Sequence, residues 1–287
     1  MKCCKVIATC FIGRKRVIND TLIVGYPPLM AIHSQNFPTE ESVLDLIRLN
    51  VEQERFVDAG IPCDTIIVNS DAGWQEGNDY LDSINNSATR CGFIRVLHRP
   101  NIGVSLGAYN DAYQKYKNEY DYWIFTEDDI LINSHHYYRI AINAFNQQKN
   151  TGFVAFIGLS IEGCNEETGQ HLLHAHNAAG ITHVSILNKV HDKFGKLPYA
   201  DNENAQGYQD VILYGEVAFT NVIKQLGYEL RELKSNPPLY WFAYDFMRGI
   251  RIAARPTIWN LLTWRINRTR KWSIKILSKL LNFRGNV

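Results

Sequence analysis

Strand-like runs alternate with helical patterns along most of the chain. The strand-like runs, which are rich in β-branched and aromatic residues, lie at 5–12, 64–69, 93–97, 122–126, 152–158 and 181–187. The helical patterns lie at roughly 40–58, 78–89, 105–117, 135–148 and 215–226. Because strands that alternate with helices usually pair in parallel, we expect an α/β fold with a mostly parallel sheet flanked by helices.

One connection is unusually long. The 29 residues 14–42 separate the first strand-like run from the body of its helix, and they include three prolines. A loop of this length in a compact domain is usually functional or contains structure of its own. We favour a small extra hairpin in this segment.

Charge divides the chain into two parts. From Arg251 to the end there are nine basic residues and no acidic ones, which leaves 21 of the 30 basic residues against 29 acidic ones in the remainder. We therefore expect a globular domain over 1–250 and a basic segment over 251–287. Plotted as a helix, residues 255–283 are amphipathic, which suits a helix lying on an anionic membrane surface. The alternative is a helix that packs on the domain or on a second subunit.

Cysteine usage and the amino terminus indicate the compartment. The six cysteines form no C-x-x-C pair, so reduced thiols in the cytoplasm are expected rather than a disulfide framework or a zinc site. The apolar stretch 6–13 is followed directly by the basic cluster 14–16, unlike a secretory signal, and we expect it to be the first strand. No stretch approaches the roughly 20 apolar residues needed to cross a bilayer.

Three consecutive acids, Glu127, Asp128 and Asp129, follow the run at 122–126. Open α/β sheets bind ligands at the carboxyl ends of their strands. Carboxylate oxygens suit hard cations such as Mg²⁺ or Mn²⁺, which in turn hold diphosphates. Alternatively, the acids connect a strand to a helix capped by Ser134, where negative charge is mildly favourable. The triplet alone leaves both interpretations open.

Three further segments add candidate residues, each with an ordinary alternative. Segment 101–110 has two glycines at an expected helix start, which favours anionic groups but also suits a tight turn. Segment 68–71 ends a strand with side chains that could contact a nucleotide, although they are common turn residues. Glu216, in segment 214–228, is placed at an expected helix start, where a carboxylate is often only a dipole partner.

In order and spacing, these segments resemble the inverting family 2 glycosyltransferases of the GT-A fold. The family has an N-x-G-x-x-x-G/A helix start, an acidic triplet after a hydrophobic strand, and a late acid before a G-Y pair. The matching residues span roughly 5–230 of this chain, and residues 179–195 are similar to the acceptor-side strand and helix. The resemblance implies transfer of one sugar from a nucleotide-diphosphate sugar to an acceptor hydroxyl, with inversion.

The resemblance also implies a role for each matching residue. Asp129 would hold Mn²⁺ or Mg²⁺, while Asp128 and Glu127 would orient the ribose or metal-bound water. Glu216 would be the general base. The remaining nucleotide contacts would fall on Thr9, Asp71 and Arg99. His174 and His176 could line the acceptor pocket or complete a metal shell, but ordinary polar histidines are favoured.

Some positions depart from the family pattern. The first strand keeps only the threonine of P-T-Y-N, Val68 to Asp71 replaces V-D-D-G-S, and Gly215-Glu216 replaces E-D. The Q-x-x-R-W motif of processive synthases is missing, which favours the addition of one sugar per encounter. A sugar nucleotidyltransferase of the same fold is the first alternative, but residues 12–16 supply only one glycine of its G-x-G-T-R loop. A non-catalytic, membrane-associated binding protein is the second.

The expected partners are a nucleotide sugar and a glycan or lipid-linked acceptor, such as a precursor of a cell-surface glycan or glycolipid. An anionic membrane surface would bind the basic segment 251–287. No nucleic acid partner is expected. The location expected is the cytoplasm, at the cytoplasmic face of a membrane.

Overall fold

The computed structural model describes residues 1–11, 15–18, 21–24, 40–70, 73–164, 171–175, 178–201, 208–235, 239–242, 244–245 and 250–251. The chain divides into two compact units, Met1–Phe242 and Ala243–Val287. In the second unit, β14 (Tyr244–Asp245) pairs antiparallel with β15 (Ile250–Arg251). The boundary expected at residue 250 stays a prediction, and the amphipathic helix expected over 255–283 lies outside the described residues.

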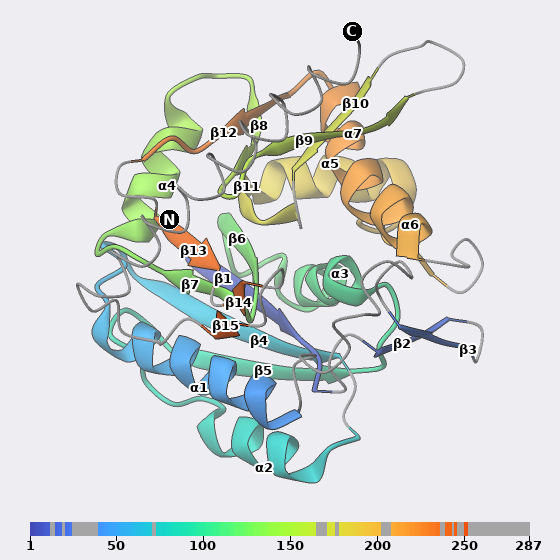
Figure 1. Ribbon diagram of the computed structural model, residues 1–287. Coiled ribbons are helices and arrows are strands. Elements are labelled where there is room, and N and C mark those ends of the chain that lie inside the picture. The colour runs from blue at the N-terminus through green and yellow to red at the C-terminus, as the bar shows by residue number, and fades with distance from the viewer. Residues whose placement is uncertain are drawn as a thin grey trace, which may run out of the picture. The chain divides into compact units, whose positions relative to one another are not determined.

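The first unit is built on a seven-stranded sheet with the order β12-β8-β11-β6-β1-β4-β5 (Figure 1). The strands are β1 (Cys3–Thr9), β4 (Cys63–Ser70), β5 (Ile94–Arg99), β6 (Tyr122–Glu127), β8 (Thr151–Ala155), β11 (Gly180–His183) and β12 (Glu229–Glu232). Strand β11 runs antiparallel to both of its neighbours, and the other pairs in the sheet are parallel. The mostly parallel sheet predicted from the sequence is confirmed.

Helices cover both faces of this sheet (Figure 1). They are α1 (Glu40–Phe56), α2 (Gln75–Ile84), α3 (Val104–Tyr116), α4 (Tyr137–Asn146), α5 (Val184–Phe194), α6 (Tyr208–Val211) and α7 (Ala218–Gln225). Successive side chains of a strand point to opposite faces. Accordingly, Ile7 of β1 packs in a cluster with α1 and α2, whereas Val6 belongs to a larger cluster that contains α3 to α5 and α7. The α/β class with flanking helices is therefore confirmed.

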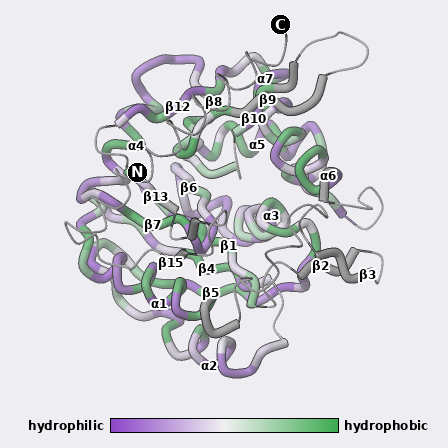
Figure 2. Tube along the Cα trace, in the orientation of Figure 1, coloured by the Kyte–Doolittle hydropathy of each residue, from purple (hydrophilic) through white to green (hydrophobic). Residues whose placement is uncertain are grey.

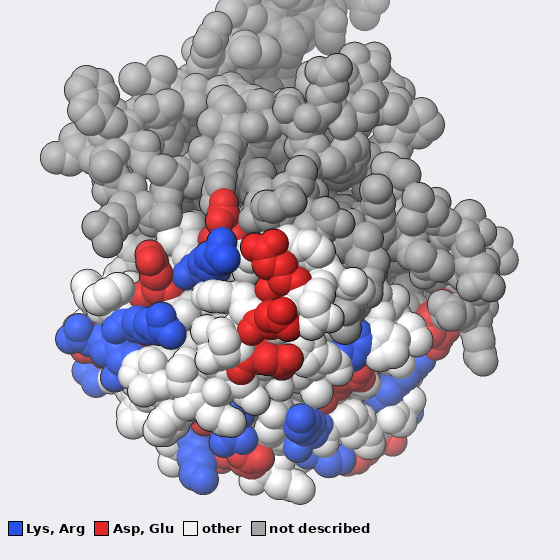
Figure 3. Space-filling model, turned by 90° about the horizontal axis from the view of Figure 1, so that it is seen from below, with Lys and Arg blue, Asp and Glu red and all other residues white. Residues whose placement is uncertain are grey.

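The helices are amphipathic, as their position requires. The tube of α1 alternates between hydrophilic and hydrophobic residues (Figure 2), and its buried residues include Leu44 and Ile47. On the outer face formed by α1 and α2, acidic side chains form a short row with basic side chains on either side (Figure 3). Arg48 lies 3.5 Å from Asp45 there and over the ring of Tyr80. This mixture of signs is typical of a solvated surface.

Short strand pairs lie outside the main sheet. They are β2 (Lys15–Ile18) with β3 (Thr21–Val24), β7 (Ile130–Ile132) with β13 (Tyr240–Phe242), and β9 (Leu159–Cys164) with β10 (His171–Ala175). The hairpin of β2 and β3 confirms the one expected within 14–42. No helix in the described part of the chain is both long and apolar enough to span a membrane.

Two sequence-based boundaries are wrong. The strand expected over 181–187 ends at His183, where α5 begins, because the Nδ1 atom of His183 accepts a hydrogen bond from the Ser185 N–H at 3.1 Å and caps the helix. The helix expected over 135–148, with Ser134 as its cap, begins at Tyr137 instead and has His136 in the cap position. The three acids are followed by β7, so the interpretation that they lead directly into a helix is also wrong.

Candidate functional site

The strand order reverses between β1 and β6. After β1 the chain adds β4 and β5 on one side, and then crosses back to place β6 on the other side of β1. In open α/β sheets, the crevice outside the carboxyl ends of two such strands is the usual ligand site. Thr9 ends β1 and Glu127 ends β6. The acidic triplet therefore lies at the topological switch point of the sheet.

Contacts from β1 and α1 fix Asp128. The Thr9 hydroxyl donates to Asp128 Oδ2 at 2.6 Å, and the Asp128 N–H donates to the carbonyl of Ala8 at 3.2 Å. The Asn50 amide on α1 donates to the Asp128 carbonyl at 2.7 Å. Two of the predicted residues, Thr9 and Asp128, are thus brought into direct contact, and Asn50 is a neighbour that the sequence did not reveal.

The beginning of α3 fixes Glu127. The Ser105 hydroxyl, in the first turn of this helix, donates to Glu127 Oε1 at 2.5 Å. Gly103 precedes the helix with φ of +71°, and a Cβ atom there would lie 2.2 Å from a ring carbon of Tyr199. Glycine is therefore required at this position. The helix start also brings its partial positive charge close to the acids.

Tyr109 shows where the acids converge. It lies one turn beyond Ser105 on α3, and its ring stacks on Phe125 of β6 with the ring centroids 4.5 Å apart. Burial raises the pKa of Tyr109 well above its ordinary value, and the negative charges of four acids raise it further. In order of effect these acids are Glu127, Glu216, Asp129 and Asp128. The structure thus brings the late acid Glu216 into the same region as the triplet.

Asp129 and Glu216 differ in their access to solvent. Asp129 lies in the turn between β6 and β7 and is 2% exposed. The side chain of Glu216 is 16% exposed. Burying a carboxylate is costly unless it is paired, hydrogen-bonded or bound to a cation. The turn between β6 and β7 thus holds Asp129 in the interior, whereas Glu216 stays within reach of solvent.

Glu216 lies in a stretch of π-helix, η3 (Ile212–Val217), between α6 and α7. The sequence placed it at the start of a helix, and this is wrong, because the helical run already begins at Tyr208. A favourable interaction with a helix dipole therefore does not explain this carboxylate. Short π-helical turns inside helices are frequent at functional sites. The buried imidazole of His174 on β10 faces Glu216, with Nε2 at 3.8 Å from Oε2.

The other predicted residues have different surroundings. Arg99 is 9% exposed, and its guanidinium donates to Asp111 at 2.5 Å, to the Ser70 hydroxyl at 3.1 Å and to the Ile102 carbonyl at 2.6 Å. Arg99 therefore stabilises the turn between β5 and α3. Asp71 and His176 lie outside the described residues.

Within the described ranges, no group of three or more His, Cys, Asp or Glu side chains is arranged to hold a metal ion. The acids at the switch point offer carboxylate oxygens, which suit hard cations. Mg²⁺ is usually bound through one or two carboxylates together with substrate phosphates, rather than in a cage made by the protein alone. The donor set therefore fits an ion that the protein and a diphosphate hold jointly.

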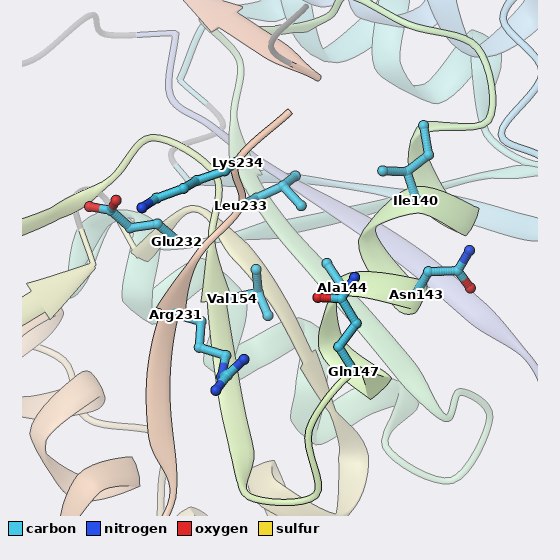
Figure 4. A pocket seen from close by; sticks show the side chains of 9 residues that line it. All are labelled: Ile140, Asn143, Ala144, Gln147, Val154, Arg231, Glu232, Leu233 and Lys234. Carbon is cyan, nitrogen blue, oxygen red and sulfur yellow. The ribbon is translucent and has the colours of Figure 1, made fainter. Parts of the chain in front are cut away.

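A separate hollow of about 360 Å³ lies between α4, β8 and β12. Ala144, Val154 and Leu233 give it an apolar part, and Arg231 and Lys234 add charge. Leu233 points toward α4 in Figure 4, whereas Lys234 points away from it. None of the acids of the switch point lines this hollow. It is therefore distinct from the candidate site.

Comparison with known proteins adds little to this geometry. No protein-family model matches the sequence, and no curated protein matches it. Among solved structures, a cytidylyltransferase from Leptospira borgpetersenii serovar Hardjo-bovis (strain JB197) aligns with a TM-score of 0.44 and 10% sequence identity. The alignment covers 82% of this chain and 76% of that chain. A likeness this weak carries no argument about activity, so function has to be argued from the site.

Proposed function

We propose that the protein is a metal-dependent inverting glycosyltransferase. It moves one sugar from a nucleotide-diphosphate sugar to an acceptor hydroxyl. The observation that carries the proposal is the placement of Glu127, Asp128 and Asp129 at the switch point between β1 and β6, where Thr9 and Ser105 hold two of them. Glu216 is near enough for its charge, like theirs, to raise the pKa of Tyr109. Three of these acids lie at the end of one strand, and the fourth comes from a helical segment far away in the sequence. The donor and the acceptor can therefore be contacted by different elements.

Asp129 is proposed as the residue that holds Mn²⁺ or Mg²⁺. Its carboxylate oxygens are the ligands that such hard cations prefer. When bound, the ion neutralises charge on the departing diphosphate. Asp128 and Glu127, which Thr9 and Ser105 hold in place, orient the ribose or metal-bound water. Thr9, Asp71 and Arg99 stay the proposed nucleotide contacts.

Glu216 is proposed as the general base. It accepts the proton of the acceptor hydroxyl while that oxygen bonds to the anomeric carbon and the bond from this carbon to the diphosphate oxygen breaks. Inversion requires attack from the face opposite the leaving group. A base on a separate element from the triplet meets this requirement, and the partial exposure of Glu216 leaves it within reach of an acceptor.

The acceptor is proposed to be a glycan or lipid-linked precursor at the cytoplasmic face of a membrane. The support comes from the nine basic residues from Arg251 to the end of the sequence. Each basic residue near an anionic membrane surface adds roughly 1 kcal/mol of attraction. The basic segment would therefore keep the enzyme beside a lipid-linked acceptor.

The test uses the purified full chain with UDP-, GDP- and dTDP-sugars, in the presence of Mn²⁺ or of EDTA. We expect release of the nucleoside diphosphate from one donor class with Mn²⁺ and none with EDTA. A parallel reaction with nucleoside triphosphates and sugar 1-phosphates detects pyrophosphate. If pyrophosphate forms without release of a nucleoside diphosphate, the protein is a sugar nucleotidyltransferase instead. If neither product forms, the protein is a non-catalytic binding protein.

Calorimetry tests the metal assignment separately. Asp129→Asn keeps the size of the side chain but removes the charge that a hard cation requires. We expect the variant to lose Mn²⁺-dependent binding of the nucleoside diphosphate while its melting temperature changes little. Binding equal to that of the wild type would refute the assignment.

A further inference from the structure

The role proposed for Glu216 raises the question of what holds its side chain. The Thr220 hydroxyl donates to the Glu216 carbonyl at 2.8 Å, and this contact fixes the backbone of the π-helical stretch. A glutamate side chain has three rotatable bonds, so a fixed backbone does not fix its carboxylate. A general base has to lie within hydrogen-bond reach of the proton that it removes. A second contact, made by the carboxylate itself, is therefore needed.

His174 is in position to make that contact. It lies on β10, which packs against η3 and α7. Its side chain is 1% exposed, and its Nε2 atom lies 3.8 Å from Oε2 of Glu216. A buried imidazole has little freedom to move, since the core around it is close-packed. The rigid partner is thus the histidine, and the longer, more mobile side chain is the glutamate.

We propose that His174 is a positioning residue for Glu216. Its Nε2 atom faces the carboxylate at 3.8 Å, and this contact holds the carboxylate toward the acceptor side of the site. The inference rests on the proposed function, in which Glu216 is the general base. It assigns His174 neither to a metal shell nor to the acceptor pocket, because its Nε2 atom faces the Glu216 carboxylate at 3.8 Å.

The contact itself is tested without any activity. In protein labelled with ¹⁵N-histidine, the His174 ring signals are assigned from their loss in His174→Gln. We expect Glu216→Gln to shift the Nε2 signal of His174 and to leave that of His183, the cap of α5, unchanged. An unchanged His174 signal would overturn the proposal, whatever reaction the protein catalyses.

The consequence of the contact is tested by kinetics on the donor identified with the wild type. His174→Gln keeps an N–H group close to the position of Nε2, whereas His174→Asn places its amide close to Nδ1. We expect the asparagine variant to lose tenfold or more in kcat with an unchanged KM for the nucleotide sugar. The glutamine variant should stay within a few-fold of the wild type.

His183→Gln is the matched control, because it alters a capping histidine away from the acids. It should lower the melting temperature and leave kcat unchanged. Equal kcat in the wild type and in a folded His174→Asn would overturn the positioning role. If the wild type releases no nucleoside diphosphate, the proposed function fails, and the NMR shift still decides whether His174 holds Glu216.

Discussion

At the scale of single residues, Tyr109 combines a buried ring with a hydroxyl that has no hydrogen-bond partner among the residues that the structure describes. Leaving a buried hydroxyl unsatisfied costs about 1–3 kcal/mol. Tyr109→Phe removes this hydroxyl and keeps the stacking on Phe125. We therefore predict that urea unfolding will show an unchanged free energy of unfolding, or a gain of about 1 kcal/mol.

Tyr113, one turn further along α3, is the control for this prediction. Its hydroxyl donates to Asn188 Oδ1 at 2.6 Å. Tyr113→Phe should lower the free energy of unfolding by about 1 kcal/mol, since a hydrogen bond is lost and a partner is left unsatisfied. Equal destabilisation in the two variants would contradict the difference described between the two hydroxyls.

Asp121 gives a prediction about pH. The Lys2 N–H donates to its carboxylate at 2.7 Å, and this bond, helped by the terminal ammonium, lowers the pKa of Asp121 below its ordinary value of 3.8. A lowered folded-state pKa contributes stability at pH values above 3.8, and this contribution is lost as the pH falls through the folded value. The side chain is half exposed, so the effect is small.

We therefore predict that Asp121→Asn is less stable than the wild type at pH 7 and equally stable near pH 2. Urea unfolding at the two pH values measures the difference. A stability difference that persists unchanged at the lower pH would mean that the charge of Asp121 does not contribute.

At the scale of elements, the start of α3 holds Glu127 of the triplet through Ser105. Gly103→Ala would impose a side chain at positive φ and drive a Cβ atom against Tyr199. We predict a loss of more than about 1 kcal/mol in the free energy of unfolding. Binding of the Mn²⁺–nucleoside diphosphate should also weaken, since the Ser105–Glu127 contact shifts.

Gly195 offers a matched control at the other end of a helix. It follows α5 with φ of +73°, and a Cβ atom there would meet nothing within 4 Å. Gly195→Ala thus carries the backbone strain without the collision. If the two variants unfold with the same free energy and bind the diphosphate equally well, the contact with Tyr199 has no importance for the site.

The elements that could be predicted are those that a short stretch of sequence identifies by its own hydrophobic pattern. Strands β1, β4 and β6 contain short apolar runs, and the acids at the end of β6 are visible in the sequence. The register that joins Thr9 to Asp128 follows from parallel pairing, which a pattern only implies. The hairpin of β9 and β10, which carries His174, is not among the strand-like runs predicted from the sequence.

The position of Glu216 could be predicted only in part. The resemblance selected this acid, but the glycine before it suggested a helix start, whereas Gly215 lies within a longer helical run. Tyr109 was not selected at all, because a buried tyrosine on a helix looks like any core residue. Its importance arises from tertiary packing, which joins α3, β6 and η3.

At the scale of the whole molecule, the basic segment stays a prediction. We expect the full chain to bind vesicles that contain phosphatidylserine at low salt and to dissociate as ionic strength rises. A chain ending at Ala254 should not bind them and should still bind the Mn²⁺–nucleoside diphosphate. If the truncated chain unfolds, or if the full chain does not bind the vesicles, this segment has a structural role.

The triplet and Glu216 are proposed as two parts of one transferase site. A comparison of Glu216→Gln with the wild type, in both nucleoside diphosphate release and diphosphate binding, tests this. We predict that the release rate falls by roughly 10²–10⁴-fold while the dissociation constant of the Mn²⁺–diphosphate stays within a few-fold. A release rate within a few-fold of the wild type would show that Glu216 is not the general base. The general base would then lie elsewhere, with Asp210 of α6 as the next candidate.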